Sequence, residues 1–454
     1  MRELPQPPKL TPEAIARALP RMTKPEVQRY LAVANGEYLH WEKLRYHPPP
    51  AGMTPEDVWH LVHLSRLSQR RPLPLSDLHG RAFTYWLSDS SLETLHEVDR
   101  WGGGNISFEE DAGDALISMR QRVLMNSLME EAIATSQIEG AVTTRKVAKE
   151  MLRTNRRPRD KSEQMIVNSY RTIQLLRERL KEPLGLALLL EIQESMTRET
   201  LDNPTAAGRL RLESEEITVV DSRDMEIVYV PPPATLLPER LDKLIAFANA
   251  PRDPHDFIHP LVKAAILHFW LAYEHPFVDG NGRTARALFY WFMLKSGYWL
   301  FEFLTISRAI VAAPMQYYRS FLYSEQDEND LTYSLVFQMR ATQRALGQLR
   351  EYLDRKQREQ KEMATALRRF PDLNSRQRDL LDRALKYPEQ VHTFQSHRIS
   401  QGISQLTARA DLLDLVQRGL LTEIKQGRQR GFLPAADLDR RLNPKPKKKR
   451  RSSD

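Results

Sequence analysis

The hydrophobic and polar positions of this chain repeat mainly with the period of amphipathic helices. A long pattern of this kind runs without proline from Asp111 to Glu139, and Gly140 follows it as a favourable helix-ending residue. After Tyr333 a charged helical pattern continues to about Phe370. Further helices are expected at about 144–154, 161–180, 183–199, 238–249, 260–274 and 283–297.

Strand character is clear in one pair of segments between these helices. EITVV (216–220) and EIVYV (226–230) are rich in β-branched residues and flank the polar turn DSRD. The prolines at 231–233 stop the pairing, because proline has no N–H for a strand ladder. Residues 1–110 hold short helical patterns that proline interrupts.

Composition agrees with a folded, multidomain chain. The 454 residues are 41% hydrophobic and 8% aromatic, which suffices for several cores and suggests about three domains. No apolar run approaches the roughly 18 residues that cross a bilayer, and the N-terminus has no signal-peptide core. The chain has no cysteine, so disulfides and thiolate metal sites are excluded. We therefore expect a cytoplasmic protein without a membrane segment.

Positive charge is concentrated at the C-terminus. The net charge of the whole chain is +8, whereas residues 374–454 alone carry +9. A polyanionic partner is therefore expected at the C-terminal end rather than in the centre of the chain.

The stretch HPFVDGNGRTAR, which begins at His275, gathers residues that handle protons, phosphate and metal ions. It lies between two helical patterns, and the second helix is expected to begin at or near Gly282. Free N–H groups at such a helix start form a site for anions such as diphosphate. Asp279 can hold Mg²⁺ together with phosphate oxygens. Arg283 and Arg286 offer planar donors to phosphate, and His275 is the natural general base.

This stretch resembles the Fic family. All eight specified positions of the family pattern H-x-F-x-[DE]-G-N-G-R-x-x-R are present in residues 275–286. Members of the family join a nucleotide to a protein hydroxyl, usually AMP from ATP onto Ser, Thr or Tyr. The preceding segment 258–277 looks like the family's entry helix. GRLR (208–211), followed by the strand pair, looks like the family's flap over the site.

The resemblance implies that ATP and Mg²⁺ are used. His275 would deprotonate the hydroxyl of the target protein. Asp279 would bind Mg²⁺ that bridges the α- and β-phosphates, and Phe277 would be an apolar anchor that fixes the loop.

The resemblance also implies which residues hold the phosphates. Asn281 would touch the α-phosphate within an anion hole that Gly280 and Gly282 complete. Arg283 would hold the β-phosphate and Arg286 the γ-phosphate. Such a site acts by stabilising charge on the phosphates rather than by covalent chemistry.

The strand pair, a flap at about 215–230, has a free edge to which an extended peptide can add as a further strand. That would hold the target hydroxyl near His275. The alternative is a hairpin that only covers the core.

TSQIEG, from Thr135 to Gly140, matches the family's inhibitory pattern [ST]-x-x-x-E-[GN]. In the family this glutamate, here Glu139, pairs with the second arginine of the catalytic pattern, here Arg286. The γ-phosphate then cannot dock productively. The alternatives are an ordinary helix end, or a carboxylate that positions water for the removal of AMP.

The segment MQYYRSFLYSEQDEND (315–330) resembles the part of the family that borders adenine. Tyr317 and Tyr318 are the candidate residues, and two tyrosines on a packed helix are the alternative. Seven residues after Tyr318 some relatives have asparagine, whereas this chain has Glu325, which leaves the nucleotide preference open.

The C-terminal part, 373–442, has the element order of a winged helix-turn-helix. We expect 404–418 to be its recognition helix and KQGRQRG (425–431) to be its wing. Four side chains are candidates for DNA contacts: Gln405 and Arg409 in a groove, and Arg428 and Arg430 on phosphates.

Other functions of this part remain open. Asp411 and Asp414 on the same helix argue against DNA binding. Winged helices also dock proteins or form homodimers. The tail KPKKKRR (445–451) has the composition of a nuclear localisation or nucleic-acid-binding segment, or of a disordered solubilising tail.

The sequence thus predicts a mainly α-helical protein with a Fic-type core, a β-hairpin flap and a C-terminal winged helix-turn-helix. The expected parts are an N-terminal helical domain (1–110), a catalytic domain (111–350) with an inhibitory helix at about 112–139, a helical linker (351–372), the winged helix (373–442) and a basic tail (443–454).

The predicted function is a self-inhibited adenylyltransferase that acts on hydroxyls of other proteins or of itself. Three alternatives remain: removal of AMP, transfer from another nucleotide or phosphate donor, and a DNA-binding regulator whose Fic domain senses nucleotide.

Overall fold

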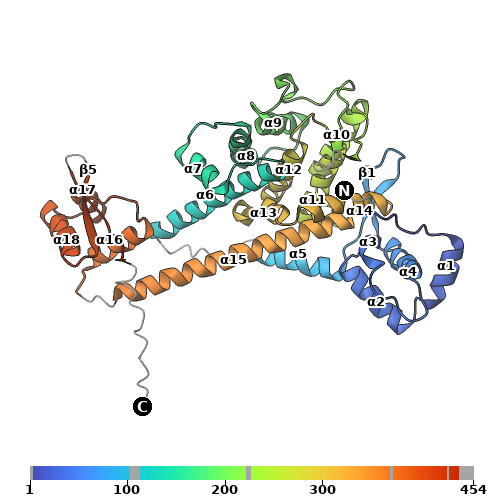
Figure 1. Ribbon diagram of the computed structural model, residues 1–454, viewed down its shortest axis with the longest axis horizontal. Coiled ribbons are helices and arrows are strands. Elements are labelled where there is room, and N and C mark those ends of the chain that lie inside the picture. The colour runs from blue at the N-terminus through green and yellow to red at the C-terminus, as the bar shows by residue number, and fades with distance from the viewer. Residues whose placement is uncertain (1–3, 103–112, 221–225, 369–371, 427–428, 439–454) are drawn as a thin grey trace, which may run out of the picture. The chain divides into compact units, whose positions relative to one another are not determined.

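The computed structural model describes residues 4–102, 113–220, 226–368, 372–426 and 429–438. The chain divides into two compact units, residues 1–349 and 350–454, with the boundary inside helix α15 (Thr332–Arg368). Helices account for most elements and the strands form three two-stranded sheets in the described parts, so the prediction of a mainly helical fold is confirmed (Figure 1).

The N-terminal part of the first unit is a helical cluster with one hairpin. Threonines with a following proline begin two of its helices: the side chains of Thr11 and Thr54 accept from backbone N–H groups of α1 and α4. The elements are α1 (Pro12–Ala18), η1 (Leu19–Arg21), α2 (Pro25–Gly36), α3 (Trp41–Leu44), α4 (Pro55–Leu67), β1 (Arg71–Ser76), β2 (Ala82–Tyr85) and α5 (Asp89–Gly102).

The hairpin β1–β2 was not predicted from the sequence. Strand β1, RPLPLS, contains two prolines, which usually argue against a strand. It is tolerated because the sheet has only these two strands, so each proline can lie on an edge that pairs with nothing in the sheet. Phe83 and Leu75 fix the hairpin on the core, since both are almost fully buried.

An ion network joins this cluster to the rest of the first unit. Arg66 is fully buried and donates to the carbonyls of Ala34 and Leu39 and to the hydroxyl of Tyr333. Arg70 lies 2.8 Å from a carboxylate oxygen of Asp330. Buried guanidinium groups with this many partners fix the position of α4 against the start of α15.

The remainder of the first unit is a helical core built around α11 (Pro260–Glu274) and α12 (Asn281–Lys295), which pack against each other (Figure 1). Both helices are buried on nearly all sides, and α12 buries polar residues at its start together with its apolar ones. Around them lie α6 (Gly113–Ile138), α7 (Arg145–Thr154), α8 (Lys161–Glu178), α9 (Leu186–Thr197), η2 (Pro204–Ala206), η3 (Ala234–Leu236), α10 (Leu237–Asn249), η4 (Trp299–Phe303), α13 (Ile306–Val311) and α14 (Pro314–Gln326).

The predicted flap forms a short antiparallel hairpin of β3 (Val219–Val220) and β4 (Ile227–Tyr229). Val219 pairs with Tyr229, and Val220 pairs with Ile227. The predicted turn DSRD lies outside the described residues. The hydroxyl of Tyr229 donates to the carbonyl of Tyr273 at 2.8 Å, which anchors the flap on the last turn of α11.

The second unit contains α16 (Ser375–Lys386), α17 (Phe394–Gln401), α18 (Gln405–Gln417) and the hairpin of β5 (Leu421–Gln426) and β6 (Gln429–Pro434). Its core gathers leucines of α16, α18 and β5 around Phe432. The predicted recognition helix corresponds to α18. The predicted wing falls at the β5–β6 turn, of which residues 427–428 lie outside the described part, as does the basic tail.

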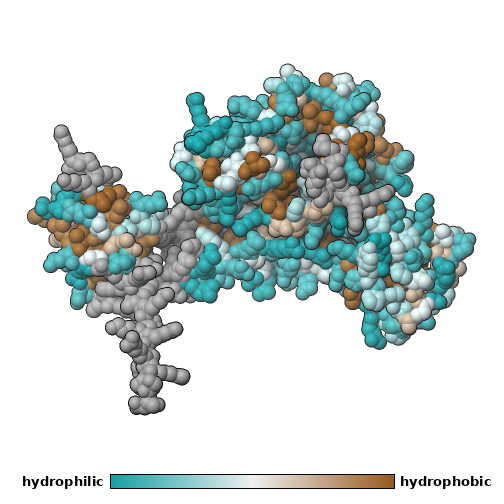
Figure 2. Space-filling model, viewed as in Figure 1, coloured by the Kyte–Doolittle hydropathy of each residue, from teal (hydrophilic) through white to brown (hydrophobic). Residues whose placement is uncertain are grey.

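Polar side chains cover most of the face of the first unit that Figure 2 shows, with smaller apolar patches, one of them near α10. Within the described ranges, no helix combines the length and the apolar character that crossing a lipid bilayer requires.

Candidate active site

The loop from His275 to Gly280 begins and ends with a residue in the left-handed backbone conformation. His275 follows α11 with φ 45° and ψ 56°, and Gly280 precedes α12 with φ 84°. At Gly280 an added Cβ would lie 2.7 Å from Thr197, so only glycine fits there. Helix α12 begins at Asn281, one residue before the predicted start at Gly282. The free N–H groups of its first turn therefore face the end of the loop.

The side chain of Asn281 fastens the loop to itself. Its Oδ1 accepts from the N–H of Phe277 at 2.9 Å, and its Nδ2 donates to the carbonyl of Phe277 at 2.8 Å. The side chain of Phe277 is fully buried, as the predicted anchor should be. The sequence prediction placed Asn281 against the α-phosphate. In the structure its amide is occupied by the loop, which leaves its backbone N–H for an anion.

His275 is placed as a neutral base. Its Nδ1 lies 3.3 Å from the carbonyl of Ala272, so Nδ1 carries the proton and Nε2 keeps a free lone pair. Burial lowers the pKa of His275 below its ordinary value, although this hydrogen bond and the nearby Glu139 and Asp279 act in the opposite direction. The imidazole is therefore unprotonated at neutral pH, as a general base requires.

Asp279 and Arg283 contact each other beside the loop. One guanidinium nitrogen of Arg283 lies 3.2 Å from Oδ2 of Asp279, and another donates to the carbonyl of Met196 at 2.9 Å. Arg283 is 1% exposed, and its Nε has no partner among the residues described. The side chain of Asp279 is 45% exposed, so its carboxylate faces both the arginine and solvent.

Arg286 is held by the end of α6 rather than left open. Its Nη2 donates to Glu139 at 2.7 Å and to the carbonyl of Thr135 at 3.1 Å, and its Nε donates to the hydroxyl of Thr135 at 2.7 Å. Its Nη1 is buried and has no partner within the described residues. The pairing of Glu139 with Arg286 is therefore present, and Thr135, which was predicted only as the first residue of the inhibitory pattern, also contacts Arg286.

Glu139 also reaches the start of α12. An added Cβ at Gly282 would lie 2.3 Å from a carboxylate oxygen of Glu139. The carboxylate thus occupies the space directly in front of the helix N-terminus, where an anion would bind. Gly140, with φ 90°, supplies the left-handed backbone that turns the chain away after Glu139.

Two further residues position the loop, and the sequence prediction did not identify them. Gln193 on α9 is fully buried, donates to the carbonyl of Asp279 at 3.1 Å and accepts from the N–H of Gly208 at 2.7 Å. Arg211 donates to the carbonyl of His275 at 2.8 Å and to that of Pro232. The only available signal was the position of Arg211 in GRLR, and Gln193 stands on an ordinary amphipathic helix.

Part of the chain is similar to known proteins. Residues 183–293 match the family model described as Fic/DOC family. The chain carries a Fic domain. A protein adenylyltransferase Fic of Nematostella vectensis is 38% identical over 99 residues, which are 21% of this chain and 20% of that protein. The protein adenylyltransferase fic-1 of Caenorhabditis elegans is 35% identical over 105 residues, or 23% and 18% of the two chains.

The chain thus spans about a fifth of the length of these curated relatives. A Fic family protein from Desulfovibrio desulfuricans has a similar solved structure, with a TM-score of 0.54 at 19% identity. The match covers 78% of this chain and 98% of that one, and it establishes a shared fold.

The two tyrosines predicted to border adenine lie on α14 in different surroundings. Tyr317 is buried, and its hydroxyl lies 3.0 Å from Nε2 of His268. Tyr318 is 40% exposed. Of the pair, Tyr318 is therefore the residue that a base can reach. Glu325 lies on the same helix, α14, seven residues after Tyr318. Burial raises the pKa of its carboxyl group to about 8.

A magnesium ion fits one carboxylate of the Fic domain. Among the described residues no group of three or more His, Cys, Asp or Glu side chains could hold a metal ion by itself. Mg²⁺ that is bound with a nucleotide needs only one or two carboxylates, because phosphate oxygens and water complete its shell. Asp279 is the partly exposed carboxylate next to the anion-binding helix start, which matches this donor set.

The candidate DNA contacts of the second unit also lie in different surroundings. Gln405 and Arg409 are exposed on α18. Arg430 is paired with Glu423, and Arg428 lies outside the described residues. Asp411, which argued against DNA binding, is 4% exposed and faces inward, where it accepts from Arg376 at 2.9 Å.

Proposed function

We propose that the Fic domain transfers AMP from ATP to a hydroxyl group of a protein. The observation that carries this proposal is the placement of His275, with a free Nε2, beside the start of α12, whose backbone N–H groups would bind phosphate once Glu139 moves away. The curated relatives named above are protein adenylyltransferases.

The reaction requires one proton acceptor and one charge-stabilising loop. The hydroxyl oxygen attacks the α-phosphorus, its proton passes to Nε2 of His275, and the bond to the β-phosphate oxygen breaks so that pyrophosphate leaves. The backbone N–H groups that begin α12 face the phosphate oxygens, where negative charge accumulates. Asn281 acts by holding the loop in this shape through Phe277.

Asp279, Arg283 and Arg286 complete the proposed nucleotide site. Mg²⁺ bound at Asp279 would neutralise charge on the α- and β-phosphates. Arg283, already beside Asp279, is within reach of the same phosphates. Arg286 can hold the γ-phosphate only when Glu139 releases it, because that carboxylate accepts from Nη2 of Arg286 and also lies beside Gly282 at the start of α12.

The flap supports a protein as the acceptor. Its strands are short and form a two-stranded sheet, so a further extended strand can add to an edge. Apolar side chains on the flap are exposed, with Ile227 at 61% and Val230 at 64%. An exposed apolar edge next to a catalytic loop favours an extended peptide over a small molecule as the acceptor.

We also propose that Glu139 inhibits the transfer. It neutralises Arg286, fills the space before Gly282 and places a negative charge where the triphosphate would lie. The same carboxylate is close enough to His275 to influence its pKa, so it could also orient water for the removal of AMP.

The second unit supports a proposal of DNA binding. The observation that favours this proposal is that Asp411 faces inward. The exposed part of α18 therefore presents Gln405 and Arg409 without this carboxylate. Truncation after residue 371 should remove retention of DNA in a low-salt mobility-shift assay and keep the transferase chemistry. Undiminished DNA retention by the truncated chain would reject the proposal.

Labelled ATP tests the main proposal directly. The purified protein is incubated with ATP that carries the label either at the α- or at the γ-phosphate, and protein-bound label is measured. Transfer of AMP gives protein-bound α-label and no γ-label. Protein-bound γ-label would instead show a phosphotransferase, which would contradict the proposal.

A further inference from the structure

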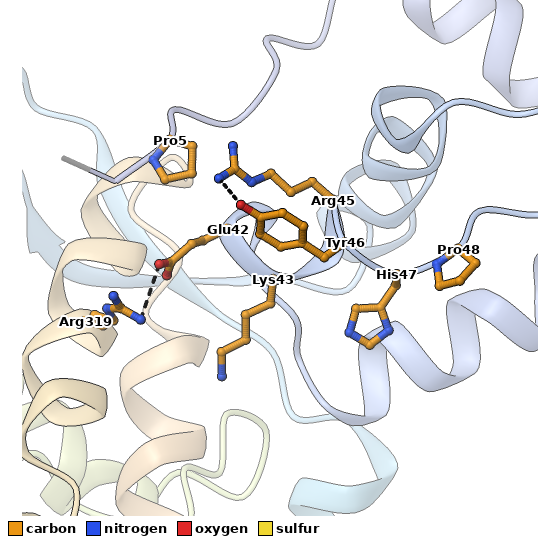
Figure 3. Close-up of a pocket in the computed structure, with 8 residues that line it drawn as sticks. All are labelled: Pro5, Glu42, Lys43, Arg45, Tyr46, His47, Pro48 and Arg319. Carbon is orange, nitrogen blue, oxygen red and sulfur yellow. Dashed lines mark hydrogen bonds and ion pairs between the residues drawn. The ribbon is translucent and has the colours of Figure 1, made fainter. Parts of the chain in front are cut away.

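A cavity of about 310 Å³ lies far from the catalytic loop in sequence and between different elements. Its walls come from the segment 37–47, which includes α3, and from α13, α14 and α15. A wider hollow of about 560 Å³ adjoins it, because both are lined by Lys43, His47 and Arg319. Figure 3 shows Lys43 projecting between Arg319 and His47 in this hollow.

The side chains that line the smaller cavity carry an excess of positive charge. Lys43, Arg319, Arg340 and Arg344 are its cationic residues, whereas Glu37 is its only carboxylate residue among those described. Arg340 donates to the backbone carbonyl of Glu37 at 3.2 Å. Burial lowers the pKa of Arg340, whereas the carboxylate of Glu37 raises it, and the charge of Arg344 lowers it by a smaller effect. These cations therefore repel one another in a partly desolvated space.

Part of this charge is neutralised by Glu42. Its carboxylate lies 3.3 Å from Arg319 and also accepts from the hydroxyl of Tyr323. Glu42 lines the wider hollow but not the smaller cavity. Lys43 and Arg344 have no ion-pair partner within the described residues, so the smaller cavity keeps a positive balance.

A buried hydrogen-bond donor without an acceptor lines the same cavity. His40 is 1% exposed, and its Nδ1 accepts from the N–H of Glu42 at 3.2 Å, which places the ring proton on Nε2. Burial lowers the pKa of His40 to about 3, so the ring is neutral. Within the described part of the chain, Nε2 of His40 and Nε of Arg319 have no hydrogen-bond partner. Buried donors in folded proteins are normally satisfied, and these two belong to residues that line the cavity.

We propose that this cavity binds a small anion that carries a phosphate group. A phosphate group offers several acceptor oxygens and up to two negative charges, which match the cations and the unsatisfied donors. The cavity exceeds the size of one phosphate ion, and the adjoining hollow presents His47 and the ring of Tyr46, which is 74% exposed. The organic part of a nucleotide can stack there.

The site would bind at a distance from the catalytic loop and does not depend on the transferase activity. Helix α14 connects the two places, because Arg319 and Ser320 line the cavity whereas Tyr317, on the other side of the helix, contacts His268 in the core of the Fic domain. A ligand in the cavity would therefore also fix the segment 37–47 against α14.

Calorimetric titration of the full chain with pyrophosphate and with AMP tests the proposal. The catalytic loop also binds phosphates, so the titration is done in an Arg286→Ala background. The start of α12 and Arg283 can still bind either probe in this background, so we expect a second site, which is recognised because the added changes Arg340→Gln and Arg344→Gln weaken it alone by at least tenfold. The matched control Lys24→Gln/Arg29→Gln removes the same charge from the exposed side of α2 and should leave the affinity unchanged.

The outcomes separate the sources of the ligand. Tighter binding of AMP than of pyrophosphate identifies a nucleotide, and the reverse order identifies an inorganic phosphate anion. Equal weakening by the control pair would show only a general effect of charge and would overturn the proposal. Absence of binding by both probes in the Arg286→Ala background would overturn it as well, provided that thermal melting shows each variant to be folded.

Discussion

Asn281 illustrates how one side chain can fix the shape of a loop. Its amide satisfies both backbone groups of Phe277, a residue whose side chain is fully buried. The spacing of the motif predicts an asparagine at a helix start. It does not reveal whether the amide turns toward the phosphate or back to the loop, because that depends on the left-handed backbone of His275 and Gly280.

Asn281→Ala should therefore destabilise the first unit as well as reduce AMP transfer. Two backbone groups would lose their partners, at a cost of about 1–3 kcal/mol in the free energy of unfolding. All seven tryptophans lie between residues 41 and 299, so urea unfolding followed by tryptophan fluorescence reports on this unit. Asn281→Asp, which keeps an acceptor for the N–H of Phe277, should be intermediate. Unchanged stability in Asn281→Ala would refute the role in the loop.

His275→Ala should abolish transfer and leave the affinity for ATP largely intact, because the base acts only in the chemical step. In the unmodified protein, kcat/KM should fall only at acid pH, with a midpoint below 6.5, because the pKa of His275 is lowered. The imidazole of His275 is then fully deprotonated at neutral pH. Binding and transfer are measured side by side across pH. Full transfer by the alanine variant would remove His275 from the mechanism.

At the scale of elements, helix limits were the most predictable feature. Capping residues and periodicity placed α7, α10, α11 and α12 within about two residues of their observed limits. The hairpin β1–β2 was missed because the prolines of β1 hide its strand character. The connections between elements were also missed, because Gln193 carries no local signal for its contacts with the loop and the flap.

Gln193→Leu should reduce transfer by loosening the loop and the flap together. The substitution keeps a similar volume on α9, but it leaves the carbonyl of Asp279 and the N–H of Gly208 without this partner. We expect a loss of about 1–3 kcal/mol in unfolding free energy and a lower kcat. Gln164→Leu on α8 is the matched control, since the side chain of Gln164 donates a hydrogen bond to Asn168 and makes none to the loop among the described residues. Equal effects of both changes on kcat would contradict the bridging role.

At the scale of the whole molecule, residues far apart in sequence meet in ways that no local pattern reveals. The cavity of about 310 Å³ brings Lys43 and Arg340 together, and the ion network joins Arg66 to Tyr333. The concentration of charge at the C-terminus could be counted from the sequence. The burial of Asp411 could not, because it depends on Arg376 and His397 from other helices.

The ion network should make the stability of the first unit depend on pH. Burial alone would lower the pKa of His63, but hydrogen bonds to Asp327 and Glu328 raise it to about 9. The raised pKa adds stability that is complete below about pH 6.5, the ordinary histidine value, and is lost as the pH rises through about 9. Urea unfolding followed by tryptophan fluorescence should show that the free energy of unfolding decreases by roughly 2–3 kcal/mol between these two pH values.

His63→Gln should flatten this profile between pH 6.5 and 9.5, because glutamine has no proton to lose. His79→Gln, in the turn between β1 and β2, is the matched control and should keep the dependence on pH. If the free energy of unfolding depends on pH equally steeply with and without His63, groups other than His63 cause the dependence.

The central claim is that Glu139 holds back an adenylyltransferase by occupying Arg286. The decisive measurement is protein-bound label from α-labelled ATP in Glu139→Gly, compared with the unmodified protein, with Gln137→Gly at the same helix end and with Glu139→Gly/His275→Ala. We predict that Glu139→Gly raises incorporation at least tenfold, which corresponds to about 1.4 kcal/mol of relieved competition. Gln137→Gly should have little effect, and the double variant should be inactive. A folded Glu139→Gly protein, verified by thermal melting, that incorporates no more label than the unmodified protein would contradict the claim.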